Sequence, residues 1–430
     1  MSGRKEDAAG GRAADDCFAL PPGVDWTPVD VALGRLRDAV GPVTGFELTE
    51  VAGAAGRVLA LPAVARRANP PAANAAVDGY AFAHASLAGA PERDGRAVLA
   101  LAPGRAAAGA PAEGAVSPGA AMRILTGAEI PEGADTVVLQ EDCEAGAGEV
   151  ALRPPRKKGA NVRAAGEDAT PGALLFPAGH RLRAQDLARL TAAGVAELGL
   201  YLPLRLAVLS TGDELIGPGG APERPGIHDA NRPMLLAFAA AQGHATVDLG
   251  MVGDDAGAVR AALDRGAAEA DAILTTGGAS TGDEDHVSRL LAEEGTINTW
   301  RIAVKPGRPL ALGHWREVPV FGLPGNPVAA FVCAVLFARP ALAAMAGESW
   351  PVPQGFMLPA GFAKTKKPGR REYLRARLGG DGRVEAFHSE GSGLIGGLAW
   401  ADGLVELPDG ALTVEPGDPV RFLPWASFGL

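Results

Sequence analysis

The spacing of apolar side chains changes along the chain and separates regions of different type. Residues 1–23 are rich in Ala, Gly and mixed charge without a periodic apolar face, which is typical of a disordered tail. Over residues 27–40 apolar positions recur at helical spacing, and we predict that Thr27 caps this helix and Pro28 begins it. The pattern of residues 49–61 predicts a second helix.

A different texture runs from about residue 62 to residue 155, where short apolar runs alternate with turns rich in Gly and Pro. This pattern is typical of a small β domain. Helical spacing returns at residues 185–193, so we expect the β domain to be inserted into a helical linker region. The predicted boundaries are 73–155 for the inserted β domain, with 24–72 and 156–203 for the discontinuous, elongated linker domain.

Strand, glycine turn and helix then alternate over residues 204–348. Such alternation predicts a parallel α/β sheet with right-handed crossovers, in which ligands bind beyond the carboxyl ends of the strands. Gly212, Gly277 and Gly325 each fall at such an end. Residues 349–430 are expected to form a second, C-terminal β domain, with strands at 371–378, 384–387 and 403–407.

Composition limits the classes of function. The chain has 430 residues, enough for several domains, and its formal net charge of −10 argues against a general nucleic-acid binder. No apolar run is judged long enough to span a bilayer, and the N-terminus lacks the apolar core of a signal peptide. The three cysteines are far apart and show neither zinc-site nor disulfide-framework spacing. We therefore expect a cytoplasmic protein without a membrane or nucleic-acid partner.

Residues 271–285 carry the strongest chemical signal in the chain. A short apolar run breaks at Gly277 and Gly278, hydroxylated residues that include Ser280 follow, and carboxylates that end with Asp285 precede a helical segment. Glycine lets the backbone approach a ligand, and free N–H groups at the start of a helix favour an anion. The carboxylates would repel a bare phosphate, but a divalent cation takes carboxylate and phosphate oxygens together. The stretch predicts a site for an anion and a metal, against the alternative of a plain strand-to-helix turn.

Two further acidic segments lie at predicted strand ends. Residues 210–214 end a strand with two carboxylates, and their alternative interpretation is a tight turn with a helix-capping aspartate. Asp254 and Asp255 precede a helix, where an acid also serves as an N-cap. The residues singled out in the first segment are Ser210, Thr211, Gly212, Asp213 and Glu214.

Cations and a helix start complete the candidate site. Lys305 and Arg308 flank a Pro-Gly turn, and opposite an anion they are candidate clamps rather than solvated charges. In residues 324–327, Asn326 is able to cap a helix that Pro327 begins, so the structural and functional interpretations coexist. None of the seven histidines has metal-ligand spacing and no serine sits in a nucleophile elbow, so we expect no covalent catalysis. The pattern favours a cleft with carboxylates, one or two divalent ions and cations opposite, suited to attack at phosphorus or a similar oxyanion.

A series of short motifs spans the chain from about residue 27 to the C-terminus. They are Val-Asp-Gly-Tyr-Ala at 77–81, Arg-Ile-Leu-Thr-Gly at 123–127, Pro-Glu-Gly-Ala-Asp at 131–135, Asn-Val-Arg at 161–163, Gly-Glu-Asp at 166–168, Ser-Thr-Gly-Asp-Glu-Leu at 210–215, Asp-Ala-Asn-Arg at 229–232, the Gly-Gly loop with Asp285, Lys-Pro-Gly-Arg-Pro at 305–309 and Gly-Leu-Pro-Gly-Asn-Pro at 322–327. In this order and spacing the chain resembles the molybdopterin molybdenumtransferase family, that is, MoeA and the E domain of gephyrin.

The resemblance implies a subunit of four regions: a helical linker domain, an inserted small β domain, a MoaB/MogA-like molybdopterin-binding α/β domain and a C-terminal β-barrel-like domain. It implies a homodimer whose cleft is shared between the α/β domain of one subunit and the inserted β domain of the other. The implied reaction hydrolyses adenylylated molybdopterin with Mg²⁺, releases AMP and inserts molybdenum from molybdate. A molybdopterin adenylyltransferase is left open as an upstream partner.

The resemblance also assigns roles to residues. Glu214, Asp254 and Asp285 are the implied metal ligands and catalytic acids, joined by Asp78 and Thr126 of the partner subunit. The residues assigned to binding of the anionic pterin substrate are Ser210, Thr211, Gly212, Asp213, Gly277, Gly278, Ser280, Lys305, Arg308, Pro324, Gly325, Asn326 and Pro327.

The chain departs from the family pattern in three places. Residues 73–77 read Ala-Asn-Ala-Ala-Val where Asp-Asn-Ser-Ala-Met is common, so a carboxylate and a hydroxyl are missing from this loop. Arg308 stands where lysine is frequent, and Asp402 where asparagine is frequent. Two other functions stay open, a non-enzymatic molybdopterin-binding scaffold and a molybdopterin adenylyltransferase, and the flanking domains argue against the second. The choice between molybdate and tungstate also stays open.

Overall fold

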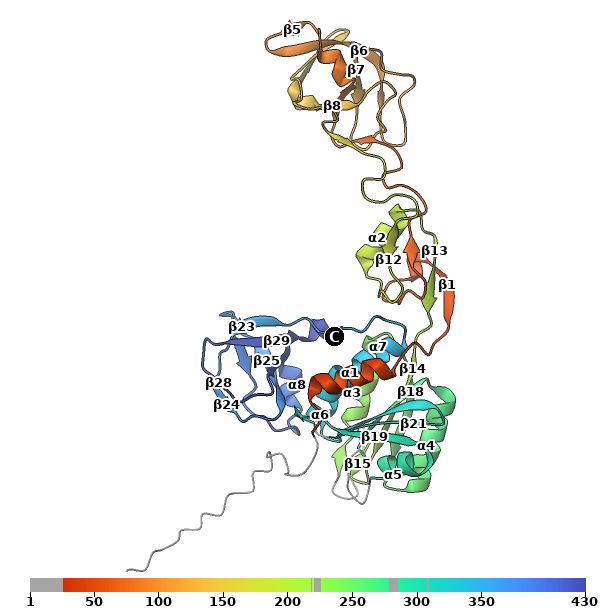
Figure 1. Cartoon of the computed structure of the whole chain (residues 1–430), viewed down its shortest axis with the longest axis vertical. Coiled ribbons are helices and arrows are strands. Elements are labelled where there is room, and N and C mark those ends of the chain that lie inside the picture. Colours follow the sequence, from red (N-terminus) through yellow and green to blue (C-terminus); the bar gives the residue numbers. More distant parts are fainter. Residues whose placement is uncertain (1–25, 218, 220–225, 278–284, 308) are drawn as a thin grey trace, which may run out of the picture. The chain divides into compact units, whose positions relative to one another are not determined.

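The computed structural model describes residues 26–217, 219, 226–277, 285–307 and 309–430. The chain forms two compact units: unit 1 comprises Met1–Thr44 and Pro203–Leu430, and unit 2 comprises Gly45–Leu202 (Figure 1). The predicted tail, together with Gly278, Ser280 and Arg308 of the predicted site, lies outside the described residues.

A six-stranded sheet lies at the centre of unit 1. In spatial order its strands are β17 (Ala245–Val252), β14 (Arg205–Thr211), β18 (Ala272–Thr276), β22 (Val318–Leu323), β21 (Pro309–Trp315) and β19 (Thr296–Arg301). The first four run parallel, as predicted, whereas β21 pairs antiparallel with both β22 and β19. Only Arg316 and Glu317 join β21 to β22, with positive φ angles of 49° and 68° as in a tight hairpin. A parallel pair would need a much longer crossover.

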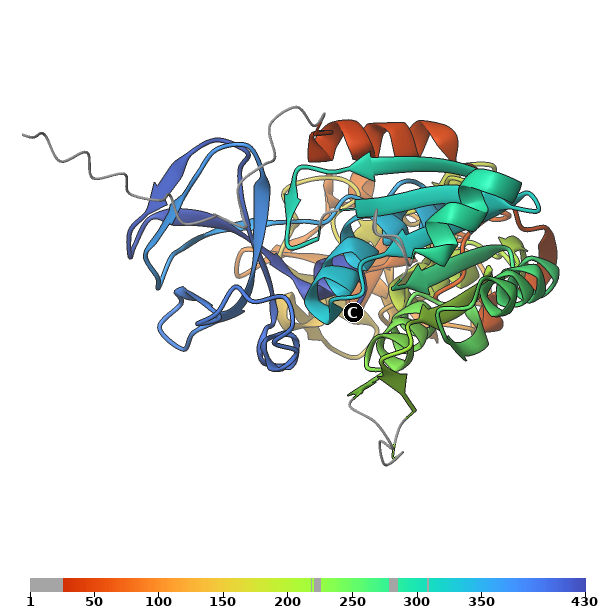
Figure 2. The same cartoon turned by 90° about the horizontal axis from the view of Figure 1, so that it is seen from below.

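Alternate side chains of β14 point to opposite faces of this sheet and create three layers. Leu206 and Val208 pack on one face with α3 (Asn231–Ala241) and with the helix that follows β22. Ala207 and Leu209 pack on the other face with α4 (Ala256–Glu269) and α5 (His286–Glu294). Figures 1 and 2 both show α4 and α5 together beside the sheet.

A long apolar helix follows β22. Its first part, α6 (Pro327–Cys333), continues through the π-helical segment η4 (Ala334–Ala338) into α7 (Arg339–Met345). Pro340 near the start of α7 has no backbone N–H to donate, and a π-helical turn just before it accommodates the missing hydrogen bond. Pro327–Met345 is long and apolar enough to cross a membrane, so the sequence-based judgement on length is wrong, but 83% of its apolar window is buried. It is a core helix of unit 1.

The first helix, α1 (Val29–Ala39), packs its apolar face against α7 in unit 1. The prediction that Thr27 caps this helix is wrong. Thr27 forms a β-bridge with Ile302, so the helix begins at Val29 with Pro28 in the N-cap position and without a side-chain cap.

The C-terminal β domain also belongs to unit 1. Its main sheet has the order β20 (Val304–Lys305), β25 (Arg371–Leu378), β27 (Gly403–Leu407), β29 (Pro419–Pro424) and β23 (Phe356–Pro359), and β26 (Val384–Ala386) pairs with β25. A separate pair consists of β24 (Lys364–Lys366) and β28 (Leu412–Val414), and α8 (Gly396–Trp400) packs beside β25. The predicted strands at 371–378, 384–387 and 403–407 are confirmed. Because β20 precedes β21 of the central sheet, its pairing with β25 joins the two domains through backbone hydrogen bonds.

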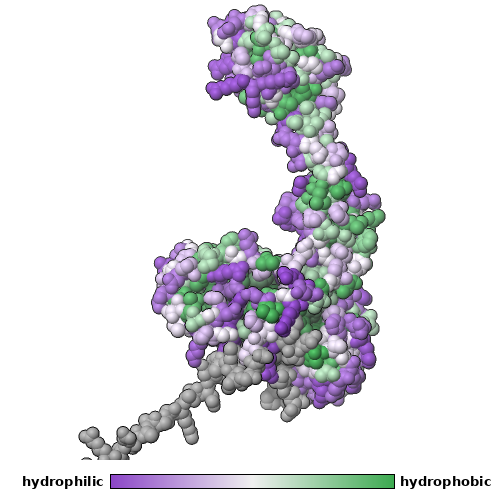
Figure 3. Space-filling view, in the orientation of Figure 1, coloured by the Kyte–Doolittle hydropathy of each residue, from purple (hydrophilic) through white to green (hydrophobic). Residues whose placement is uncertain are grey.

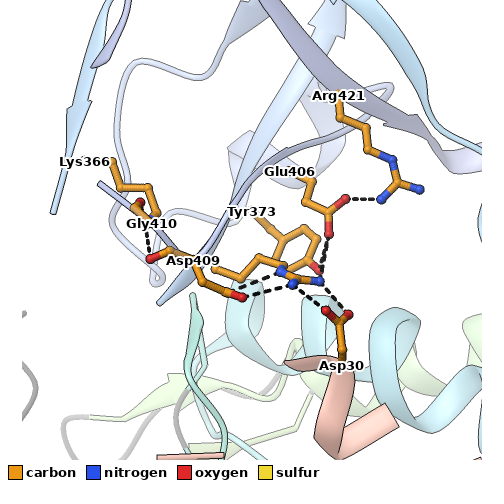
Figure 4. Close-up of polar contacts among 8 residues, drawn as sticks. Asp30, Lys366, Tyr373, Glu406, Asp409, Gly410 and Arg421 are labelled. Atoms are coloured by element: carbon orange, nitrogen blue, oxygen red, sulfur yellow. Dashed lines mark hydrogen bonds and ion pairs between the residues drawn. The ribbon is translucent and has the colours of Figure 1, made fainter. Parts of the chain in front are cut away.

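Arg371 connects the C-terminal β domain to Asp30 of α1, which is labelled in Figure 4. Its guanidinium donates two hydrogen bonds of 2.8 Å to the Asp30 carboxylate of α1. The same group contacts Asp409 at 3.0 Å and Glu406 at 3.4 Å, and the Tyr373 hydroxyl donates to Glu406 at 3.0 Å. The hydrogen bonds to Asp30, set against partial burial, raise the pKa of Arg371, which therefore stays charged.

Unit 2 begins and ends in one group of strands. In this group β1 (Phe46–Glu50) pairs with β13 (Glu197–Tyr201), and β2 (Ala63–Val64) pairs with β12 (Leu174–Phe176). The helix predicted at 49–61 is wrong, because these residues form the end of β1, a 3-10 turn (Val51–Gly53) and irregular chain. Pairing with β13 outweighs the helical spacing there. The helix predicted at 185–193 is confirmed as α2 (Ala184–Ala192).

The rest of unit 2 is a small β domain of the expected type. Its sheet has the order β8 (Thr136–Leu139), β4 (Gly79–Phe82), β7 (Ala120–Ile124), β6 (Arg96–Ala106), β10 (Glu149–Leu152) and β9 (Cys143–Ala145), with β5 (Glu92–Arg93) beside β6. Where the chain enters and leaves it, β3 (Asn74–Ala75) pairs with β11 (Val162–Arg163). The proposed domain boundaries stay predictions. Hydrophobic residues reach the surface of unit 2 around β1, where Phe46 and Leu48 are exposed (Figure 3).

Candidate functional site

A cavity of about 390 Å³ lies at the carboxyl ends of β14, β18 and β22. Thr211 ends β14, Thr276 ends β18, and the turn after β22 contributes Gly325, Asn326 and Pro327. Ligands of parallel sheets bind at this edge. The cavity therefore lies where the glycine turns of the sequence predict ligand binding.

Gly277 permits the strand ends to approach each other closely. Its φ is +84°, and a Cβ at this position would lie 2.3 Å from the Thr211 carbonyl oxygen. A Cβ on Gly325 would lie 3.7 Å from the Gly277 Cα. A side chain at position 277 would force the ends of β14 and β18 apart, so the shape of the cavity depends on this glycine.

Asn231, in the first turn of α3, links the elements around the cavity. Its side-chain amide donates to Thr276 Oγ1 at 2.8 Å and to the Gly325 carbonyl at 2.7 Å. The Thr276 hydroxyl in turn donates to the Pro324 carbonyl at 3.2 Å. One buried amide thus fixes α3, β18 and the turn before α6 together. Asn231 is missing from the predicted binding residues, although its Asp-Ala-Asn-Arg motif supports the resemblance.

Three residues that line the cavity each have a buried side-chain oxygen without a hydrogen-bond partner among the described residues. These oxygens are Oγ of Ser210, Oγ1 of Thr211 and Oδ1 of Asn231. Because buried polar groups are nearly always paired, three such oxygens in residues around one cavity favour a polar ligand there. Ser210 and Thr211 are predicted binding residues, and the structure places both on the cavity.

The predicted acidic residues occupy different positions at this edge. Asp213 and Asp254 lie side by side, since each carboxylate accepts the backbone N–H of the other residue at 3.1 Å. Glu214 lines the cavity and folds against Gly212, where a Cβ would lie 2.4 Å from Glu214 Oε2. Asp285 occupies the N-cap of α5, where Oδ1 accepts a backbone N–H of that helix at 2.9 Å. The capping alternative considered for Asp254 and Asp255 is confirmed at Asp255, the N-cap of α4, where Oδ1 accepts the Ala258 N–H at 2.7 Å.

Metal binding by these acids stays a prediction. Within the residues that the structure describes, no three His, Cys, Asp or Glu side chains converge closely enough to hold a metal ion. The implied ligand set of Glu214, Asp254 and Asp285 is therefore not assembled there. Mg²⁺ usually binds one or two carboxylates together with waters and substrate phosphates. The adjacent Asp213 and Asp254 carboxylates fit that simpler arrangement.

Lys305 of β20 lines a second cavity, of about 240 Å³, whose other lining residues come mostly from the C-terminal β domain. Its ammonium group lies 2.5 Å from the Glu390 carboxylate. Residues 388–395 run between the two cavities, because Glu390 lines the second one while Gly393 and Ile395 line the first. The C-terminal β domain thus contributes to the strand-end cavity, a contribution that the sequence analysis missed because no charged motif marks Gly393 or Ile395.

Asp78 and Thr126 lie together in unit 2, in the small β domain. Asp78 Oδ1 accepts hydrogen bonds from both the backbone N–H and the hydroxyl of Thr126, each at 2.7 Å. These hydrogen bonds lower the pKa of Asp78, so the carboxylate is ionised at neutral pH. The structure places these two predicted residues in mutual contact.

Sequence models of known families match three consecutive parts of the chain. The MoeA N-terminal region (domain I and II) matches residues 27–194, a probable molybdopterin binding domain matches residues 207–344, and the MoeA C-terminal region (domain IV) matches residues 358–425. A Haemophilus influenzae protein named molybdopterin molybdenumtransferase is 30% identical over 92% of this chain and 98% of its own length. The chain belongs to the molybdopterin molybdenumtransferase family.

Other proteins support this membership in the molybdopterin molybdenumtransferase family. Molybdopterin molybdenumtransferase 2 of Mycobacterium tuberculosis is 32% identical over 90% of this chain and 96% of its own length. The crystal structure of a molybdopterin biosynthesis MoeA protein from Pyrococcus horikoshii matches with a TM-score of 0.80 at 27% identity, covering 93% of this chain and 100% of that one. The fold class expected for the family, a multidomain combination of α/β and β domains, is confirmed.

Proposed function

We propose that this chain is a molybdopterin molybdotransferase, which inserts molybdenum from molybdate into adenylylated molybdopterin and releases AMP. The observation that carries the proposal is the strand-end cavity, with unpartnered oxygens of Ser210, Thr211 and Asn231 beside the Glu214 carboxylate. This cavity lies in the region that matches a probable molybdopterin binding domain. Relatives of nearly equal length carry the molybdenumtransferase name, which supports a transferase role in molybdenum cofactor biosynthesis.

Each part of the cavity has a role in this proposal. Gly277 and Gly325 leave the backbone open to the pterin and its phosphate, and the Asn231 amide keeps both strand ends in place. Ser210 and Thr211 orient the ligand through their hydroxyl groups. Glu214, next to the cavity, accepts protons and orients water at the phosphoanhydride.

Mg²⁺ belongs to the proposal as a bound cofactor. Asp213 and Asp254 are the residues that would hold it, whereas Glu214 and Asp285 stay predicted ligands. When bound, the ion supplies charge neutralisation for the phosphate oxygens.

The proposal includes a homodimer in the cytoplasm, served by a molybdopterin adenylyltransferase upstream. Asp78 and Thr126 belong to unit 2 and the cavity to unit 1, and we infer that a second copy brings them together. The exposed apolar side chains of Phe46 and Leu48 support a protein contact on unit 2.

The activity is tested by AMP release from adenylylated molybdopterin in the presence of Mg²⁺ and molybdate. We expect Glu214→Gln and Asp285→Asn to abolish turnover while the chain stays folded. Glu269→Gln is the matched control, because this exposed glutamate pairs with Arg265 on α4, away from the cavity. Absence of AMP release from the folded wild-type protein would favour the non-enzymatic scaffold.

The shared cleft is tested by complementation. Asp78→Ala and Asp285→Asn chains are inactive alone in this proposal, but a mixed dimer keeps one intact cleft and regains activity. Light scattering gives the oligomeric state, and a dimer without complementation would place all catalytic residues within one subunit.

A further inference from the structure

The lining of the second cavity includes Lys305, Lys364 and Arg375 as cations and Glu372 and Glu390 as carboxylates. The ammonium of Lys305 lies 2.5 Å from Glu390 Oε2 and 3.7 Å from Glu372 Oε1. The ammonium of Lys364 lies 3.1 Å from Glu372 Oε2 and also contacts Glu390 Oε1. Each carboxylate therefore bridges both ammonium groups.

The two carboxylates differ in how readily they can leave the cluster. Glu372 lies in β25 and its side chain is 9% exposed, whereas the side chain of Glu390 is 44% exposed. Rotating the Glu390 side chain into solvent would expose little surface that is now buried. The Glu372 side chain is largely buried, so it stays as the partner of both lysines.

The backbone on either side of Glu390 is held without the help of its side chain. The buried Arg375 donates hydrogen bonds to the carbonyl oxygens of Ser389 at 2.5 Å, Gly391 at 3.1 Å and Leu394 at 2.7 Å. Three bonds from one guanidinium fix the course of the loop. The Glu390 side chain is therefore able to swing outward while the loop that borders both cavities keeps its shape.

From this geometry we infer that Glu390 is a displaceable counter-ion of the Lys305–Lys364 pair, and that an anionic ligand binds these lysines by exchange with its carboxylate. The inference rests on the proposed function, in which Lys305 contacts an anionic substrate. In the exchange, ligand oxygens replace the two Glu390 oxygens on the same ammonium groups, and no covalent bond changes. Glu390 then sets the affinity of the lysines for anions, because every anionic ligand pays the same cost of displacing its carboxylate.

The Glu390 carboxylate is a competitor at neutral pH. Partial burial opposes its ionisation, but hydrogen bonds from Lys305 and Lys364 outweigh that effect and lower the pKa of Glu390. Replacing it with glutamine keeps the size of the side chain and removes the competing charge.

The test compares wild-type protein with Glu390→Gln by titration calorimetry, using molybdate as a doubly charged probe and nitrate as a singly charged one. Glu385→Gln is the matched control, because Glu385 is equally exposed at 44% and pairs with Arg377 of the same domain. We expect the Kd for molybdate to fall about tenfold in Glu390→Gln, the size of one charge-assisted hydrogen bond, and to stay unchanged in the control. The Kd for nitrate should fall by a similar factor in Glu390→Gln, because both anions displace the same carboxylate.

Unchanged or weaker molybdate binding in Glu390→Gln would overturn the inference, because Glu390 would then support Lys305 rather than compete for it. Absence of molybdate binding in both proteins would overturn it as well. Thermal melting reports whether the variants are folded, and Glu390→Ala repeats the comparison in a second side chain. AMP release is measured in parallel: its absence in the wild type refutes the proposed function, whereas normal release with unchanged affinities refutes only the role of Glu390.

Discussion

Asp30 and Arg371 are 341 positions apart in the sequence and share two hydrogen bonds of 2.8 Å (Figure 4). The pair fastens the first helix of the described chain to the C-terminal β domain. Asp30 is exposed, whereas Arg371 is largely buried and serves two further carboxylates, Glu406 and Asp409. The arginine should therefore contribute more to stability than its exposed partner.

Because Arg371 is buried and Asp30 is exposed, substitutions at the two positions should lower the free energy of unfolding by different amounts. Arg371→Met leaves Glu406 and Asp409 without this cation, and we expect it to lower the free energy of unfolding of unit 1 by about 3 kcal/mol. Asp30→Asn should cost about 1 kcal/mol or less, as is usual for exposed ion pairs. Urea denaturation followed by tryptophan fluorescence measures both values, and equal losses would contradict the assignment.

The lowered pKa of Asp186 makes the stability of unit 2 depend on pH. Burial of its carboxyl opposes ionisation, but hydrogen bonds from Arg183 and His180 outweigh this and lower the pKa of Asp186 from 3.8 to about 2. Because the folded pKa is the lower one, the stabilisation is complete above about pH 4 and is lost as the pH falls toward 2. The amount is about 2 kcal/mol.

The measurement is the urea midpoint of unit 2 between pH 6 and pH 2.5, compared with that of Asp186→Asn. The variant should be less stable at pH 6, and the difference should shrink on acidification. If the difference in urea midpoint between the two proteins stayed constant over this pH range, the Asp186 carboxylate would not be the source of the pH-dependent stability.

Gly277→Ala should damage the strand-end cavity through a steric clash, because its Cβ would lie 2.3 Å from the Thr211 carbonyl oxygen. Gly250→Ala is the control, since Gly250 has nearly the same φ, +85° against +84°, but open space around its Cβ position. Backbone strain alone costs about 1–2 kcal/mol in either variant. We expect only Gly277→Ala to lose molybdopterin binding, which is measured by fluorescence titration. Equal losses of binding in both variants would mean that backbone strain, rather than the clash with Thr211, is responsible.

Asn231→Ala should loosen the turn before α6, because the amide that joins Thr276 to the Gly325 carbonyl is removed. A buried carbonyl left without its donor costs about 1–3 kcal/mol. Thr276→Val removes the same link from the other side, so the double variant should lose less than the sum of the two single changes. Strict additivity of the unfolding free energies would show that the two side chains act independently.

Strongly patterned elements of this fold follow from sequence. The strands at 371–378 and 403–407 lie where the sequence predicts them, and most of their side chains are buried. The strand β1 and the β-bridge of Thr27 do not, since both depend on partners far away in the chain. Local spacing contains no information about such partners.

Some residues of the candidate site can also be predicted from the sequence, and others cannot. Gly277 and Gly325 are predictable because a parallel sheet gathers its ligand at the ends of its strands. Asn231, Gly393 and Ile395 reach the same cavity from elements whose placement depends on tertiary packing, and their motifs are otherwise ordinary. Lys305 is recognisable as a cation near an anion site, but its engagement by Glu390 follows only from the docking of the C-terminal β domain.

Because β1 pairs with β13, the part of unit 2 that lies beyond these two strands could be removed from the chain. Phe46 lies opposite Tyr201, and the Leu202 N–H donates to the Gly45 carbonyl at 2.9 Å, so the entering and leaving chains are immediate neighbours. A two-residue turn grafted between these strands would excise everything beyond them without stretching the backbone. The same junction would accept a foreign module with closely spaced ends, which makes unit 2 exchangeable between homologues by simple recombination.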